Sequence, residues 1–150
     1  MYSLIRLTSG HLGEFKGLLR MFGEAFQDVP AYTASMPSDD YLRTLLDKPT
    51  FVATAAMHGD EAVGGIAAYV LEKFEQDRRE IYIYDLAVAA AHRRKGVATA
   101  LIEHMRKIAR DIDAYVIYVQ ADRGDAPAVA LYESLGRREE VLHFDISPAK

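Results

Sequence analysis

Apolar residues recur at helical spacing in several stretches of this chain. In the first stretch they fall every three or four positions, at Leu12, Phe15, Leu19, Phe22 and Phe26. This period recurs in residues 38–46, where Ser38 is the N-cap, and in residues 96–112. A shorter helix over residues 127–135 begins with Pro127, and Gly136 ends it as a C′ glycine. We therefore predict about four helices, with a loop between Pro30 and Pro37 that contains Tyr32.

Apolar and β-branched runs between these helices predict the strands. The runs cover residues 3–7, 51–57, 62–71, 81–88, 114–119 and 141–146. His58, Gly59 and Asp60 separate the second run from the third, which is typical of the turn in an antiparallel hairpin. No linker or internal repeat divides the chain, so we expect a single domain over residues 1–150. The order of elements predicts an α/β (α+β) fold, with a mixed sheet and helices packed on it.

Composition excludes several kinds of site and reaction, but it says less about the function. The chain has no cysteine, which excludes disulfides, thiolate metal sites and a cysteine nucleophile. Its five histidines are scattered without metal-ligand spacing, so we expect no metal. It shows no signal peptide or membrane span, which favours a cytoplasmic protein with no membrane partner. The net charge of −4 argues against nucleic acid and favours a cationic ligand.

The segment from His92 to Thr99, between the strongest strand pattern and the longest helix pattern, predicts an anion site. Three cations, Arg93, Arg94 and Lys95, stand at the positive end of the helix, where cations are disfavoured unless an anion is bound. Gly96 and Ala98 are small enough for a phosphate to approach the backbone. A solvated basic cluster is the alternative, while the P-loop and dinucleotide patterns are absent.

The same segment resembles the Q/R-x-x-G-x-G/A motif of the GNAT superfamily of N-acetyltransferases. The resemblance implies the GNAT fold, with a largely antiparallel sheet, and acetyl-CoA as co-substrate. It also implies that the preceding strand end pairs with the pantetheine arm, and that the loop binds the pyrophosphate. The strand residues are Leu86, Ala87 and Val88; the loop residues are Arg93, Arg94, Lys95, Gly96, Val97, Ala98 and Thr99.

A second stretch, residues 125–136, resembles the GNAT signature N-x-x-A-x-x-L/F-Y-x-x-x-G. The resemblance places Tyr132 against the sulfur of CoA, where a phenol of pKa about 10 can protonate the departing thiolate. Without the motif, a half-buried helix tyrosine is the simpler interpretation. Asp125 replaces the usual asparagine of the cofactor site, so it either repels the CoA phosphates or caps its helix.

The acceptor amine must lose a proton before or during attack, and a carboxylate near it can take that proton, directly or through water. Asp85 is our candidate for this base or for a substrate anchor, with Glu80 behind it. Strict strand alternation places Asp85 on the face opposite Tyr82 and Tyr84, and a β-bulge would change that face. A structural hydrogen-bond acceptor at Asp85 and an exposed carboxylate at Glu80 are the alternatives.

A closer resemblance suggests the acceptor. Residues 73–76, 80–88, 114–122 and 138–146 resemble the type I aminoglycoside 3-N-acetyltransferases. This similarity implies transfer to the 3-amine of the 2-deoxystreptamine ring, by direct attack in a ternary complex. Carboxylates would attract such a polycation. The proposed contacts are Tyr84, Asp85, Asp122, Asp125 and Asp145.

Other functions fit the same sequence. A GNAT enzyme that acetylates a polyamine, another small amine or a protein amine is the first alternative. A CoA-binding sensor without catalysis is the second, and the complete loop and Tyr132 argue against it. A homodimer is expected if the apolar last strand pairs across an interface.

Overall fold

The computed structural model describes residues 1–149, which form two compact units. The first unit covers residues 1–120 and the second begins at Ala121. The first holds the whole sheet and four of the α-helices, and the second holds one helix and an extended C-terminal segment. Each unit is described by itself, and the single domain expected from the sequence stays a prediction.

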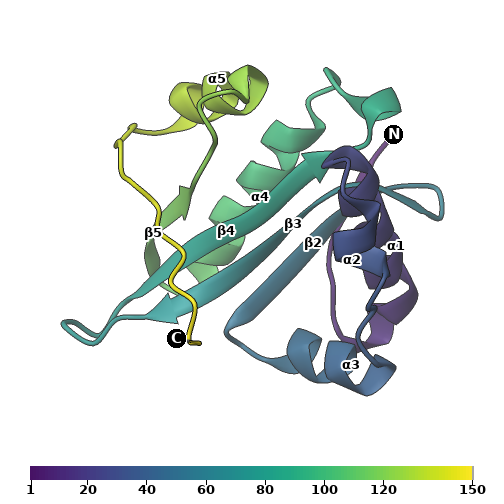
Figure 1. The fold of residues 1–150 in the computed structure, drawn as a ribbon, viewed down its shortest axis with the longest axis horizontal. Helices are drawn as coiled ribbons and strands as arrows, with labels where there is room; N and C mark the ends of the chain where they lie inside the picture. Colours follow the sequence, from purple (N-terminus) through teal and green to yellow (C-terminus); the bar gives the residue numbers. More distant parts are fainter. Residues whose placement is uncertain (150) are drawn as a thin grey trace. The chain divides into compact units, whose positions relative to one another are not determined.

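The sheet of the first unit has five strands in the order β1-β2-β3-β4-β5 (Figure 1). The strands are β1 (Ser3–Arg6), β2 (Phe51–His58), β3 (Glu61–Glu72), β4 (Arg79–Val88) and β5 (Ala114–Val119). All neighbours are antiparallel except β4 and β5, which run parallel. The predicted hairpin is confirmed, since β2 and β3 pair antiparallel from Phe51 to His58. The predicted α/β class with a mixed, largely antiparallel sheet is likewise confirmed.

Helices cover both faces of this sheet. The helices of the first unit are α1 (Leu12–Ala25), α2 (Val29–Thr33), α3 (Asp39–Asp47) and α4 (Val97–Asp111), with 3₁₀ turns at η1 (Ser9–His11) and η2 (Ala90–His92). A Cβ built on Gly65 would meet Leu18 of α1, whereas one built on Gly64 would meet Val97 and Leu101 of α4. Successive strand residues point to opposite faces, so α1 and α4 pack on opposite sides of β3.

The predicted loop between Pro30 and Pro37 contains a helix. Asp28 caps α2 by accepting a hydrogen bond from the amide of Ala31, at 3.4 Å, and Pro30 lies in its first turn. The helix has only five residues, fewer than two turns, so its apolar residues show no helical period along the sequence. It places Tyr32 beside Phe22 of α1, with ring centroids 6.1 Å apart.

Two predictions for the second unit are wrong. Residues 141–146 form no strand, and their large apolar side chains are exposed, Ile146 by 88%. A strand pattern needs a partner strand for its backbone hydrogen bonds, and these residues have none in the described chain. Helix α5 (Ala126–Leu135) does end before Gly136, yet that glycine is extended, with φ −153°, rather than left-handed.

Two absences can be stated for residues 1–149. No helix among them is both long and apolar enough to cross a membrane. No group of three or more histidine, aspartate or glutamate side chains within the same range is arranged to hold a metal ion.

Candidate active site

Strand β4 carries a bulge that decides which way Asp85 faces. Ala67 of β3 lies opposite Asp85, but its neighbour Ala68 lies opposite Ile83, so Tyr84 is the extra residue. Asp85 therefore shares a face with Ala67 and with Tyr82, which pairs with Tyr69. Helix α1 covers this face, because it also includes Gly65. Strict alternation, which would put Asp85 on the face opposite Tyr82, is therefore wrong here, because the bulge turns the Asp85 side chain towards α1 and α2.

The bulge also marks the point where β4 and β5 separate. The parallel pairing of the two strands ends at Ile83 and Val119, although β4 continues to Val88. Residues 84–88 therefore have β3 on one side and no strand of the sheet on the other. Leu86, Ala87 and Val88 lie in this open half of β4. The backbone of these residues can therefore pair, as a strand would, with an extended ligand arm that carries amide groups.

The loop after β4 presents free amide groups to solvent. Residues 93–96 are exposed and lead into α4, whose N-cap Gly96 has φ 80° and provides no side-chain cap. The amides of residues 94–99 have no backbone acceptor among the described residues. Arg94 is also left-handed, with φ 60°. Val97 is buried against the sheet, so the helix start is fixed in place.

These two features fit a phosphorylated ligand with an extended amide-bearing arm. Amides at a helix N-terminus, with Arg94 and Lys95 beside them, complement a pyrophosphate. Arg93 instead turns back, because its Nε donates a hydrogen bond to the Val88 carbonyl at 3.0 Å. This contact ties the loop to the end of β4.

Asp85 is half-buried and its carboxylate is held by one tyrosine. The Tyr32 hydroxyl donates a hydrogen bond to Asp85 Oδ2 at 2.8 Å. Burial raises the pKa of Asp85 above its usual range, and the hydrogen bond from Tyr32 partly opposes that rise. A carboxylate with a raised pKa is a better proton acceptor near neutral pH than a solvated one.

Aromatic rings surround this carboxylate on the strand side. Tyr84 is exposed and contacts Tyr69 and Tyr82 edge-on, with ring centroids 5.9 and 5.8 Å away. Tyr82 also stacks on Tyr118 at 4.6 Å. The predicted substrate contacts Tyr84 and Asp85 are therefore brought together. Exposed tyrosine faces attract ammonium groups through cation–π interactions.

Glu80 lies apart from this group. Five positions separate it from Asp85, which corresponds to about 16 Å along a strand. Its carboxylate accepts a hydrogen bond from Tyr115 at 2.5 Å and pairs with Lys73 at 3.3 Å. These two contacts hold the pKa of Glu80 below its usual range. A carboxylate stabilised in its charged form is a weak base, so the geometry favours Asp85 for that role.

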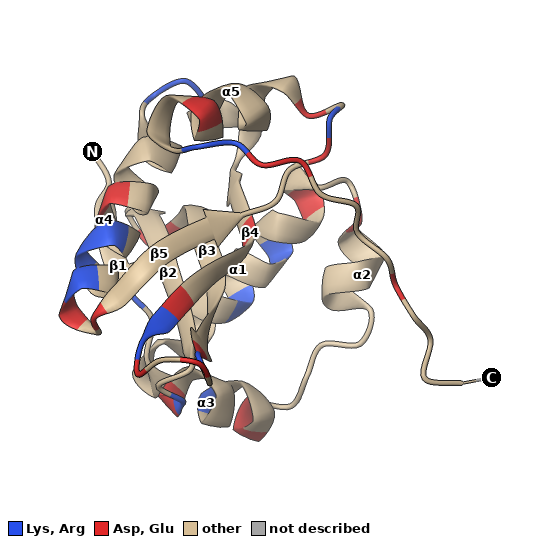
Figure 2. Ribbon diagram, turned by 90° about the vertical axis from the view of Figure 1, so that its left-hand side faces the viewer, with Lys and Arg blue, Asp and Glu red and all other residues tan. Residues whose placement is uncertain are grey.

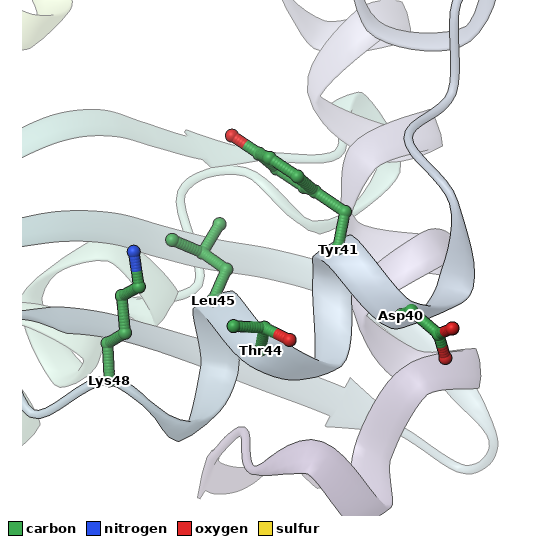
Figure 3. Close-up of a pocket in the computed structure, with 5 residues that line it drawn as sticks. All are labelled: Asp40, Tyr41, Thr44, Leu45 and Lys48. Atoms are coloured by element: carbon green, nitrogen blue, oxygen red, sulfur yellow. The ribbon is translucent and has the colours of Figure 1, made fainter.

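Two pockets adjoin these elements in the first unit. One, of about 210 Å³, lies between the end of α1 and the segment after β4, and includes Glu24, Ala89 and Arg93. The other, of about 250 Å³, opens on α3, where Figure 3 shows Leu45 between Tyr41 and Lys48. The first reaches the phosphate loop through Arg93, whereas the second contains none of the predicted site residues.

The remaining predicted residues belong to the second unit. Tyr132 is half-buried in α5, and burial together with the charge of Asp125 raises its pKa. Asp125 caps α5 by accepting a hydrogen bond from the Ala128 amide at 3.3 Å. Helix capping was one of the two alternatives that the sequence left open for this residue. Asp122 is exposed. Asp145 is also exposed, and its Oδ1 lies 2.9 Å from Nε2 of His143.

Sequence reasoning missed the role of Tyr32. The sequence placed it in a loop, 53 residues away from the aspartate that it contacts. The only available signal was its position between two prolines, in a segment able to cover the site.

Comparison with known proteins identifies the family. Residues 15–136 match the model of the acetyltransferase (GNAT) family. The chain belongs to the GNAT family of acetyltransferases. The matched residues include the β4 edge, the loop over residues 93–99, Asp85 and Tyr132, and they end before Asp145. The GNAT fold predicted from the sequence is therefore confirmed.

Two solved structures of aminoglycoside acetyltransferases are similar to this chain. An aminoglycoside acetyltransferase from an uncultured soil metagenomic sample is 52% identical, with a TM-score of 0.97 and 99% of each chain covered. A second such enzyme, solved in complex with sisomicin, is 30% identical with a TM-score of 0.89, over 97% of this chain and 95% of its own.

The curated relatives are matched over only part of their length. Streptothricin acetyltransferase of Streptomyces lavendulae is 32% identical over 60% of this chain and 44% of its own length. Across these relatives the chain spans 35% to 59% of their lengths.

Proposed function

We propose that this acetyltransferase moves an acetyl group from acetyl-CoA to an amine of an aminoglycoside, the 3-amine of the 2-deoxystreptamine ring. One observation carries the proposal: the bulge in β4 places the half-buried Asp85 carboxylate beside the open half of the same strand. A proton acceptor and a place for the acyl donor therefore lie within a few residues of each other. The 52% identity to an aminoglycoside acetyltransferase over almost the whole chain supports this class of acceptor.

The proposed reaction is a direct transfer. The acceptor ammonium gives a proton to Asp85, and its nitrogen then attacks the thioester carbon. The C–N bond forms, the C–S bond breaks, and Tyr132 gives its phenolic proton to the departing thiolate. The acylated nitrogen then releases its second proton, which restores the Tyr132 phenol through solvent. Because burial raises the pKa of Tyr132, the phenol stays protonated at neutral pH. No side-chain nucleophile is needed, which suits a chain without cysteine.

The acceptor would meet carboxylates and tyrosine rings rather than cations. Asp85 and Tyr84 are the proposed contacts in the first unit, with Asp122, Asp125 and Asp145 in the second. Among the side chains that affect the pKa of Asp85, none is a lysine or arginine. A polyamine or a protein amine could use the same charges, so the acceptor must be tested directly.

The test measures thiol release from acetyl-CoA with sisomicin, spermidine and a basic peptide as separate acceptors. We expect rapid release with sisomicin and a singly acetylated product, whose NMR spectrum identifies the 3-amine. Asp85→Asn and Tyr132→Phe should each lower kcat by about 100-fold or more while CoA still binds. Release with spermidine or the peptide alone would overturn the acceptor but keep the enzyme class. CoA binding without turnover on any acceptor would favour a sensor.

A cytoplasmic location and a homodimer remain predictions. The exposed apolar residues 141–146 are the proposed dimer contact, and sedimentation of the Phe144→Asp variant tests it.

A further inference from the structure

Within the described part of the chain, Tyr32 is the one side chain that hydrogen-bonds the proposed base. Its hydroxyl donates to Oδ2 of Asp85 at 2.8 Å, and no hydrogen bond to Oδ1 is formed within residues 1–149. Oδ1 is also absent from the fully buried polar atoms that lack a partner, so solvent reaches it. One carboxylate oxygen is therefore occupied and the other is available to an incoming ammonium group.

Close packing of α2 on α1 fixes the position of Tyr32. A Cβ built on Gly23 of α1 would lie 3.1 Å from Val29 Cα and 3.3 Å from Tyr32 Cβ, so any larger residue would require α2 to move by a few tenths of an ångström. The ring of Tyr32 also contacts the rings of Phe22 and Phe26, with centroids 6.1 and 5.8 Å away. These contacts hold the hydroxyl in place through the ring and not through the hydrogen bond alone.

Few ionisable groups face Asp85. Helix α2 carries no charged side chain, as Figure 2 shows, and Asp28 at its N-cap acts on Tyr32. Tyr69 comes from β3, and Tyr82 and Tyr84 from β4. No cation among the described residues lowers the pKa of Asp85, so Tyr32 is the one group that counteracts the effect of burial.

We propose that Tyr32 is a positioning residue, which holds Asp85 through Oδ2 and leaves Oδ1 to accept the proton of the acceptor ammonium. The proposal rests on the role given to Asp85 in acetyl transfer. The proton moves from the ammonium nitrogen to Oδ1, and the electron pair of the N–H bond stays on nitrogen. Tyr32 keeps its own proton throughout, because burial and the Asp85 carboxylate raise its pKa far above the usual range.

The direct test is the Tyr32→Phe variant, which removes the hydroxyl and keeps the ring. Without the donor, burial acts alone on Asp85, and its pKa should rise by about half to one pH unit. The pKa is read by ¹³C NMR of labelled aspartate carboxyls, with the Asp85 signal assigned from Asp85→Asn. The acidic limb of the kcat/KM profile should move to higher pH by the same amount. Tyr41→Phe, which removes an exposed hydroxyl on α3, serves as the matched control.

A second variant moves Tyr32 without deleting its hydroxyl. Gly23→Ala should push α2 away from α1 and shift the pKa of Asp85 in the same direction. Gly13→Ala is its control, since a Cβ at this α1 position meets nothing within 4 Å. Both results together would support positioning through α2.

An unchanged Asp85 pKa in Tyr32→Phe would overturn the proposal, and so would a shifted pKa with an unmoved kinetic profile. Full activity of Asp85→Asn would instead refute the base in the proposed function. The NMR titration does not depend on turnover, so the two failures are distinguishable.

Discussion

At the scale of single residues, Asp85 and Glu80 show how surroundings separate two carboxylates of one strand. Burial raises the pKa of Asp85, and only a hydrogen bond from a neutral donor opposes the rise. Glu80 meets Lys73 and Tyr115, and its pKa falls. The first arrangement favours taking up a proton and the second favours keeping the negative charge. The same residue class is therefore suited to proton transfer at one position and to an ion pair at the other.

The contacts of Glu80 predict a pH-dependent contribution to stability. A lowered pKa stabilises the fold above the ordinary value of 4.5, and this stabilisation is lost as the pH falls through the folded-state pKa. We expect Glu80→Gln to lower the free energy of unfolding at pH 7 by no more than about 1 kcal/mol. The difference from the natural protein should shrink as the pH falls below 4.5. Urea unfolding at several pH values measures it.

The control for this experiment is Glu72→Gln. Glu72 is exposed at the end of β3 and forms no ion pair within residues 1–149. An equal loss in both variants, or a loss in Glu80→Gln that does not depend on pH, would contradict the ion-pair explanation.

At the scale of elements, the contact between α1 and β3 depends on Gly65. A Cβ there would lie 2.4 Å from Leu18 Cδ1 and 2.7 Å from the Thr54 carbonyl, and the carbonyl belongs to the neighbouring strand. Gly65→Ala should therefore cost about 1–3 kcal/mol of unfolding free energy, the usual range for overpacking. Urea unfolding measures this loss, with Gly13→Ala as the reference. A loss no greater than in the reference would show that α1 moves freely on the sheet.

The sequence predicted most elements of the first unit, because their apolar periods are long. It predicted the anion loop, since that follows from local residue order, whereas strict alternation put Asp85 on the wrong face and left the bulge in β4 as an open alternative. It missed the five-residue helix α2, which is too short to show a period, and therefore the Tyr32–Asp85 contact. It wrongly predicted a strand over residues 141–146, because an alternating pattern cannot show whether a partner strand exists. It also grouped Glu80 with Asp85, because the two are close in sequence. Their closeness in sequence could not show that Glu80 pairs with Lys73 while Asp85 contacts Tyr32.

At the scale of the whole molecule, the open half of β4 makes ligand binding a part of fold stability. If the pantetheine arm pairs with residues 86–88, acetyl-CoA should slow amide hydrogen exchange there and in residues 94–99. The fold should gain about 2.7 kcal/mol at a ligand concentration 100 times its Kd. Hydrogen-exchange mass spectrometry and thermal unfolding measure these effects.

Adenosine 3′,5′-bisphosphate provides a matched ligand that has phosphates but no pantetheine arm. It should protect less of the chain than acetyl-CoA, and residues 86–88 should exchange at the rate of the free protein. Equal protection of residues 86–88 by both ligands would contradict the proposed strand pairing.

The gap beside residues 84–88 has a cost as well as a use. Unpaired backbone groups at a sheet edge are templates for the edges of other chains, and aggregation begins at such places. If acetyl-CoA fills the gap, it would also shield it, so the soluble lifetime of this enzyme should follow the supply of acetyl-CoA in the cell. Starvation for the acyl donor would then remove activity twice, first by emptying the site and later by precipitating the protein.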